Sequence, residues 1–541
     1  MQKSVSIRFD LSQIFGIDLR TLALFRIALA LVLLFDLFMR ALDVSAFYTD
    51  AGVLPRSAQI EIYSGLPSLI SLHLMSGTLG AQLGLFAVSF AAALSLLVGY
   101  RTTTATFVSW VLLVSIHNRN PMVLQGGDVL LRLLLFWSLF LPIGARASLD
   151  RLLASNHDTL ASNRAANETS PPNPDSPRVG ADETTGLSAN SLLVSTATLA
   201  ALLQVCFVYW FTSAMKTDAS WRVDGTALGY ALSIDQLSRP LGRFLLGFPD
   251  LLRPLTFFTL ALERFGPFVA LLPFWRLRTG MVIIFIVFHL VMGLCLTLGI
   301  FTWIAPVAWL LFIPSDTWNW LEHRLAALRP GKLQSAVTCV QVPAEKARLG
   351  LTTQGRKLGL RTVSPRRAFR WNQNGTQILC AFLLVYVFGW NLRALDFSTY
   401  GRFFPQSWNW IGDSMRLDQV WDMFSPFPLK EDGWFVAPAR LVDGSEINLM
   451  KDGEPVRWEE PADLSTTFRD PLWQKYLLNL WAASNSAHRA PYAAYLVRGW
   501  NENHDVKQRI RSLQIIYMRQ NNLPGFRKDK IQRVVVWQQN F

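Results

Sequence analysis

Long runs of apolar residues, separated by short polar stretches, fill most of the first 395 positions. A membrane-crossing helix needs about 20 consecutive apolar residues, and somewhat fewer when its ends lie at the interface. Runs that meet or approach this length predict eight or nine transmembrane helices, at residues 22–42, 79–99, 103–116, 129–144, 191–215, 252–274, 280–299, 302–314 and 376–392. Glu263 and Pro267 predict a break in the sixth run, and 302–314 is short enough to be re-entrant instead.

Two polar linkers interrupt this pattern. Residues 155–190 are rich in Ser, Thr, Asn and Pro, a composition that buries too little apolar surface to fold. Residues 323–371 are strongly basic, with Glu345 as their single acidic residue. Because Lys and Arg accumulate in cytoplasmic loops, the pattern predicts that the N-terminus and both linkers lie inside. Everything after about Asp396 is then expected outside.

The last part of the chain, residues 396–541, has charges throughout and turn pairs such as Asp443-Gly444. This pattern predicts a hairpin of 434–442 with 446–450, helices at 470–483 and 490–500, and strands at 513–519 and 533–538. We therefore expect a polytopic all-α membrane protein with a small C-terminal α+β extracytoplasmic domain. Its expected parts are a transmembrane domain at 1–322, the basic linker at 323–371, the last transmembrane helix at 372–395 and the outer domain at 396–541.

Composition agrees with a membrane protein. Hydrophobic residues make up 51% of the chain and charged residues 16%, against roughly 25% charged in soluble proteins. The net charge of +13 is explained by cytoplasmic loops, so no nucleic-acid partner is needed, and the bilayer is the expected partner. Four scattered cysteines without a CxxC pair predict neither a disulfide framework nor a zinc site, and we expect no metal.

Polar residues at membrane depth are the first candidates for chemistry, because burying them is expensive. Lys216 ends the fifth run among aromatic residues. A desolvated amine there would have a lowered pKa and act as a base or nucleophile, although a lysine that snorkels to the interface is the alternative. His289, inside the seventh run, suits a hydrogen bond to substrate or a proton relay. The alternative is a satisfied contact between helices.

The loop from Ser115 to Asp128 gathers further polar groups between two runs. Gly126 and Gly127 would let a ligand approach the backbone. Alternatively the loop is a satisfied helix start in which Asp128 pairs with Arg132, four positions later. In the first run, Arg26 and Asp36 are expected to join buried networks with other helices. They lie about 15 Å apart along the helix axis and should not pair with each other.

Several segments resemble the horizontally transferred transmembrane (HTTM) domain of the vitamin K-dependent gamma-carboxylase and its bacterial relatives. The segments are 25–31, 47–56, 208–221 and 288–303, and the resemblance spans roughly residues 15–320. The most specific piece is Lys-Thr-Asp-Ala-Ser-Trp at 216–221. The chain departs from the family where an Asn-His pair is replaced by Gln125-Gly-Gly-Asp128, and where the large lumenal β-rich region is not recognisable.

The resemblance implies a mechanism. Lys216 would be the base that deprotonates a reduced quinone, a vitamin K hydroquinone-like cofactor. Oxygen would then convert this cofactor into a base strong enough to remove a γ-proton from glutamate before CO2 is added. His289 matches a histidine of the family and would be the second catalytic residue. The cofactor would be bound by Asn118, Gly126, Gly127, Asp128 and Trp221.

The sequence and the resemblance leave three candidate functions. The first is a gamma-carboxylase-like enzyme at the outer face of a bacterial cytoplasmic (inner) membrane. The second is a non-catalytic scaffold or maturation partner for a secreted protein or peptide. A transporter is the weakest, because no inverted repeat relates the two halves of the sequence.

Overall fold

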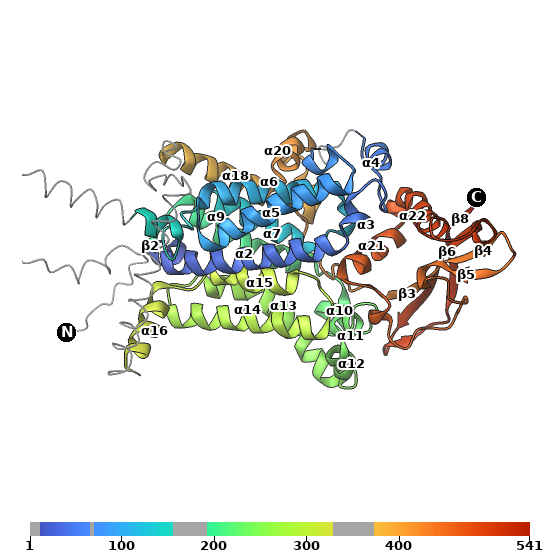
Figure 1. Cartoon of the computed structure of the whole chain (residues 1–541). Coiled ribbons are helices and arrows are strands. Elements are labelled where there is room, and N and C mark those ends of the chain that lie inside the picture. Colours follow the sequence, from blue (N-terminus) through green and yellow to red (C-terminus); the bar gives the residue numbers. More distant parts are fainter. Residues whose placement is uncertain (1–10, 65–69, 155–191, 328–372) are drawn as a thin grey trace, which may run out of the picture.

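The computed structural model describes residues 11–64, 70–154, 192–327 and 373–541. These residues are mostly helical, with a small sheet-containing domain at the C-terminal end (Figure 1). The fold class expected from the sequence is therefore confirmed at this coarse level.

Helices lying side by side build the larger part of the molecule (Figure 1). They are α2 (Leu19–Leu42), α5 (Leu79–Val98), α6 (Thr102–Arg119), α7 (Gly126–Ser138), α9 (Thr196–Met215), α13 (Pro249–Ala270), α14 (Trp275–Cys295), α15 (Phe301–Leu310) and α18 (Gln373–Leu395). Among the described residues, five helices are long and apolar enough to cross a membrane: α2, α5, α9, α14 and α18. These helices indicate a membrane protein, but the expected count of eight or nine spans is not confirmed.

The other helices differ from the expectation for physical reasons. α7 and α15 are short and mostly buried against neighbouring helices, so their apolar residues face protein, with Trp303 of α15 as an exposed exception. α13 is one continuous helix through Pro254 and Pro267, so the predicted break at Glu263 is wrong. Prolines are tolerated in such helices when neighbouring helices pack around them, and α13 packs against α9 and α14.

One end of the bundle gathers the starts of several helices. The strands β1 (Ile17–Asp18) and β2 (Leu192–Leu193) pair directly before α2 and α9. Thr196 at the start of α9 bonds Gln377 at the start of α18. α16 (Ser315–Ala327) reaches the start of α2 through Arg20 and Glu322, 2.9 Å apart. Residues 323–327 therefore belong to a helix, while residues 155–190 and 328–371 of the expected linkers lie outside the described residues.

The C-terminal domain lies at the opposite end of the bundle (Figure 1). Its central strand, β6 (Ile510–Leu523), pairs with β8 (Gln532–Asn540) on one edge and with β3 (Glu431–Val436) and β4 (Pro438–Leu441) on the other. A hairpin of β4 with β5 (Glu446–Asn448) turns at Asp443-Gly444 as predicted, but residues 434–436 form the separate strand β3. The two predicted helices are confirmed as α21 (Pro471–Trp481) and α22 (Arg489–Asn501).

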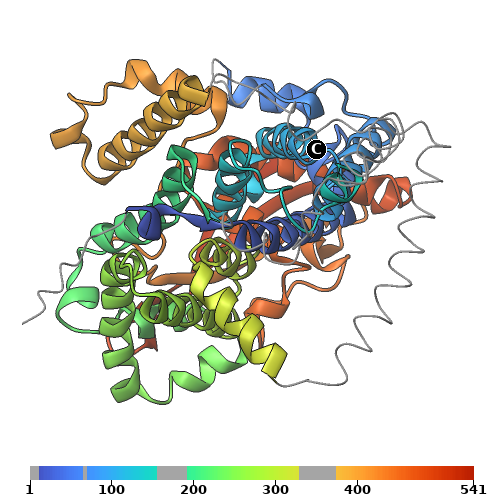
Figure 2. The ribbon, with the colours of Figure 1, turned by 90° about the vertical axis from the view of Figure 1, so that its left-hand side faces the viewer.

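Hydrogen bonds fasten this domain to segments that connect the long helices. Asn479 on α21 donates to the carbonyl of Met122, 2.8 Å away, and Asn522 on β6 donates to that of Ser233, 3.2 Å away. Short helices fill the junction: α3 (Val44–Tyr48), α4 (Arg56–Ile62), α10 (Ala219–Arg222), α11 (Ala227–Leu232), α12 (Pro240–Leu245) and α20 (Asn409–Met415). Viewed along the bundle, α13 and α14 gather on one side of α2, and α18 lies at the margin (Figure 2).

Candidate functional site

Lys216 follows the last residue of α9 and is buried inside the protein. Its side chain is 3% exposed, and Nζ lies 2.5 Å from a carboxylate oxygen of Glu263 on α13. Nζ also lies 4.2 Å from the centre of the Trp221 ring. Lys216 is therefore not a lysine that snorkels to the interface. Burial lowers the pKa of Lys216 from its ordinary value, and the Glu263 carboxylate opposes part of that shift.

The turn after α9 arranges these groups. Asp218 caps α10 by accepting a hydrogen bond from the backbone of Ser220. This cap folds the chain back so that Trp221 covers Lys216. The Trp221 indole is fixed in turn by donating to the carbonyl of Phe424, 3.0 Å away. The segment Lys216–Trp221, the most specific piece of the resemblance, thus forms one structural unit.

His289 joins a second buried network, on the same face of α9. Its Nε2 lies 2.7 Å from the hydroxyl of Tyr209, which also accepts a 2.8 Å hydrogen bond from Trp309. Tyr209 precedes Lys216 by seven residues, about two helical turns or 10 Å. Glu263 lies within electrostatic range of Tyr209. The two predicted catalytic residues, Lys216 and His289, therefore lie along one buried face of α9 without touching each other.

A cluster of charged residues joins α2, α6 and α7. Arg40 donates to Asp36 at 2.8 Å and also pairs with Asp128, while His117 Nε2 lies 3.7 Å from Asp128. The side-chain oxygens and nitrogens of Asp36, His117 and Asp128 lie within 4.8 Å of one another, close enough to hold a metal ion. The guanidinium of Arg40 already bonds both carboxylates and would repel a divalent cation placed between them, so the arrangement does not favour a metal ion.

The structure shows the partners of Arg132 and Arg26, which the sequence left open. Arg132 does not pair with Asp128 but lies 3.3 Å from Asp418, at the approach of the C-terminal domain. Arg26 donates to the carbonyl of Ala147 at 2.5 Å rather than to an acid. As predicted, Arg26 and Asp36 have separate partners.

The predicted cofactor-binding loop is packed against protein. Asn118 donates to the carbonyl of Ile70, 2.8 Å away, and so holds the loop in place. A Cβ added to Gly127 would meet the backbone nitrogen of Phe301 at 2.5 Å, and one added to Gly126 would meet Met423 at 3.2 Å. In this arrangement neighbouring protein atoms, rather than a ligand, occupy the space beside both glycines.

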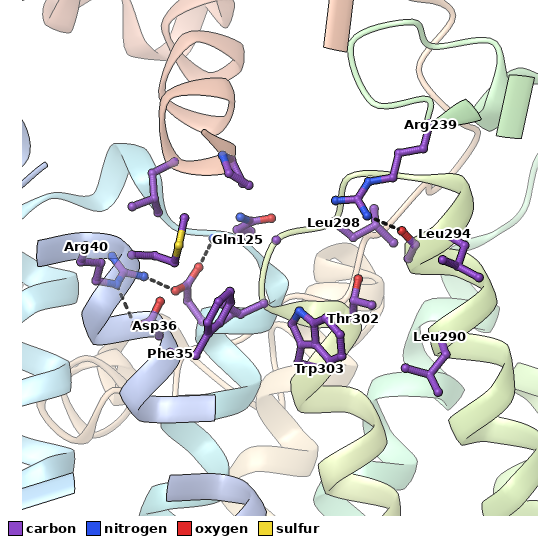
Figure 3. A pocket seen from close by; sticks show the side chains of 17 residues that line it. Phe35, Asp36, Arg40, Gln125, Arg239, Leu290, Leu294, Leu298, Thr302 and Trp303 are labelled. Carbon is purple, nitrogen blue, oxygen red and sulfur yellow. Dashed lines mark hydrogen bonds and ion pairs between the residues drawn. The ribbon is translucent and has the colours of Figure 1, made fainter. Parts of the chain in front are cut away.

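A cavity of about 270 Å³ lies between α2, α14, α15 and the start of α21 (Figure 3). Its lining includes Asp36, Arg40, Gln125 and Asp128 at one end and Arg239 at the other, with Phe35, Leu290, Leu294, Leu298, Thr302 and Trp303 between them. Of the predicted site residues, Asp128 lines this cavity, while Lys216 and His289 do not. One layer of side chains intervenes: the His289 ring lies 5.4 Å from Phe301, which directly follows the lining residue Ile300.

Sequence reasoning missed the partners of the predicted residues. The sequence pattern predicts a helix break at Glu263, although an acid in an apolar run also signals a buried cation elsewhere. Arg40 follows Asp36 by four positions, the spacing of a helical ion pair. Tyr209 carried no signal beyond its place among aromatic residues.

No protein-family model, curated protein or solved structure matches this chain. The likeness to the HTTM domain therefore rests on the sequence segments alone.

Proposed function

We propose that this chain is a membrane-embedded enzyme in which Lys216 removes a proton from a weakly acidic hydroxyl group of a lipid-phase substrate. The observation that carries the proposal is the buried pair of Lys216 and Glu263, 2.5 Å apart. Burial favours the neutral form of the Lys216 amine, and the Glu263 carboxylate stabilises the ammonium ion that forms when this amine takes up a proton. The amine then accepts the hydroxyl proton, giving an ammonium ion and a substrate oxyanion. A lysine with a lowered pKa is an effective base near neutral pH.

The position of the pair supports access from the bilayer. The Glu263 side chain is 10% exposed, so the pair lies just beneath the protein surface at α13. Phe265 and Phe268 are more than half exposed, and they lie on the opposite side of α13, about 200° and 140° around the helix from Glu263. This apolar surface suits acyl chains rather than water, and a lipid-phase substrate would pass around α13 from it to reach the pair.

The reduced quinone that the resemblance implies does not fit beside Lys216 in this arrangement. Glu263 bonds the ammonium group, Trp221 covers it, and the cavity described above does not reach it. The proposed reaction therefore does not involve a quinone. The proposal concerns proton abstraction, the class of reaction to which the implied glutamate carboxylation belongs.

We also propose a location and topology: a bacterial inner membrane, with the N-terminus and the segments 155–190 and 323–371 in the cytoplasm and the C-terminal domain outside. α16, which leads into the basic segment, lies with the start of α2 at the end opposite the C-terminal domain. The basic charge of residues 323–371 favours the cytoplasm for that end.

Comparing the lipid extracts of host membranes tests the enzyme directly. One set of membranes carries the wild type, and the other carries the double variant Lys216→Met/Glu263→Gln, in which both charges are removed together. We expect untargeted mass spectrometry to find a lipid-phase compound that changes in amount with the wild type only. Identical extracts from equally well folded proteins would contradict the enzyme and favour the scaffold, whose function would instead depend on residues 396–541.

A further inference from the structure

Arg239 is an uncompensated cation at the mouth of the cavity. It precedes α12, and its Nη1 donates to the carbonyl of Gly293 at 2.9 Å, while Nε lies 3.3 Å from Thr297. These bonds hold the guanidinium against the end of α14. Within the described residues, Arg239 has no acidic partner, and its Nη2 makes no hydrogen bond. A fixed guanidinium with free N–H groups is suited to a phosphate group.

The other cations around the cavity already have carboxylate partners. Arg40, the second cation of the lining, is paired with Asp36 and Asp128. Arg243, one turn after Arg239, pairs with Asp463 at 2.8 Å. An anion entering the cavity is therefore attracted to Arg239.

Apolar residues lead from Arg239 along α14. Leu294 and Leu290 are one turn apart, about 6 Å along the helix, and Figure 3 shows them in line below Arg239. Leu294 is 58% exposed, and Phe35 and Trp303, on the other side of the cavity, are 46% and 50% exposed. Leu294 and Phe35 lie on α14 and α2, two of the helices apolar enough to cross a membrane. The cavity therefore opens sideways toward acyl chains rather than toward water.

The C-terminal domain lines the outer side of the cavity. Pro471 and Leu472, the first residues of α21, belong to its lining. A ligand that enters from the bilayer therefore meets α21 on the outer side, beside the exposed Arg239.

We propose that this cavity binds one phospholipid with an anionic headgroup, taken from the leaflet on the side of the C-terminal domain. Its phosphate is bound by Arg239, and one acyl chain lies along Leu294 and Leu290. A headgroup with its own cation is disfavoured, because the guanidinium repels that cation. The site does not involve Lys216, so it stands or falls independently of the proposed enzyme.

Native mass spectrometry of the protein in equimolar phosphatidylglycerol and phosphatidylcholine tests the proposal. We expect the wild type to retain one phosphatidylglycerol molecule in preference to phosphatidylcholine. Arg239→Gln should lower that preference about tenfold, the effect of losing one charge-assisted hydrogen bond. Arg239→Lys should restore most of it. The control Arg253→Gln, which alters an exposed arginine outside the cavity lining, should change nothing.

A variant of the apolar part supplies a second test. Leu294→Trp fills the groove without changing a charge and should reduce retention of phosphatidylglycerol. Equal retention of both lipids by the wild type, unchanged retention by Arg239→Gln, or a quinone bound in place of the phospholipid would overturn the proposal.

Discussion

At the scale of single residues, Lys216 and Glu263 depend on each other. Both side chains are buried, and among the described residues neither has a second partner of opposite charge. Removing one member of such a pair leaves the other charge uncompensated, whereas removing both together is often nearly neutral.

We therefore predict that Lys216→Met alone lowers the free energy of unfolding by about 3–5 kcal/mol. The double variant Lys216→Met/Glu263→Gln should recover most of that loss. Unfolding in mixed micelles with increasing denaturing detergent measures both variants. A double variant as unstable as the single one would show that the pair does not exist as described.

These residues also show how much of the site can be predicted from the sequence. An isolated charge in an apolar run identifies Lys216 and Asp36 as unusual, because burial is costly wherever the partner lies. The partner is fixed by the packing of distant helices: 47 positions separate Lys216 from Glu263, and 88 separate Arg40 from Asp128. No local pattern encodes such a distance, so Glu263 was interpreted as a break in a helix.

At the scale of elements, close packing of short helices determines the interior. α7 and α15 meet at Gly127, where a Cβ would lie 2.5 Å from the backbone of Phe301. Backbone cannot move aside as a flexible side chain can, so the contact requires glycine.

We predict that Gly127→Ala costs about 1–3 kcal/mol of stability through overpacking. The matched control is Gly84→Ala on α5, where an added Cβ meets nothing within 4 Å. Its stability should be unchanged or slightly higher, because alanine favours a helix. Thermal unfolding in detergent compares the two. A Gly127→Ala protein as stable as the control would instead indicate open space, as a ligand-binding loop requires.

The junction of α2 with α21 should respond to pH. Asp43, just after α2, pairs with Arg469 at 2.9 Å and has Asp470 beside it. Burial and the neighbouring Asp470 raise the pKa of Asp43 from 3.8 to about 6. The folded state thus holds a proton more tightly than the unfolded chain, so this stabilisation is complete below about pH 4 and is lost as the pH rises through 6.

We accordingly predict that α21 opens more readily at pH 7.5 than at pH 5. Hydrogen–deuterium exchange of 471–481, corrected for the intrinsic effect of pH on exchange, measures this opening. Asp43→Asn, which resembles the protonated side chain, should remove the difference. A difference that persists in this variant would assign the response to another group.

The positions of the helices and strands were easier to predict than the number of helices that cross the membrane. The apolar runs located the helices, and turn pairs and alternation located α21, α22 and the strands of the C-terminal domain. The predicted span count is not confirmed, because an apolar run records only that residues avoid water. α7 and α15 avoid it by packing within protein, which a single sequence does not distinguish from lipid.

At the scale of the whole molecule, the bundle has two different ends. α16 lies at one end and the sheet of the C-terminal domain at the other. If the bundle crosses a membrane, these ends face opposite compartments.

We predict that single cysteines at Asp316 on α16 and Gly444 in the β4–β5 turn are labelled from opposite sides. The test uses an impermeant maleimide on sealed membrane vesicles of known orientation, with the four native cysteines replaced. Gly444 should react from the periplasmic side and Asp316 from the cytoplasmic side. Labelling of both positions from one side would contradict the topology.

The most direct measurement of the central claim is the reactivity of Lys216 itself. Phenyl isothiocyanate partitions into membranes and reacts with neutral amines, and mass spectrometry locates the modified lysine. We predict that Lys216 is modified with a midpoint pH below the ordinary lysine value of 10.5, and more readily in Glu263→Gln. The exposed Lys507 of the same chain is the reference. If Lys216 resists modification until pH 10 in both proteins, it is not the base of an enzyme.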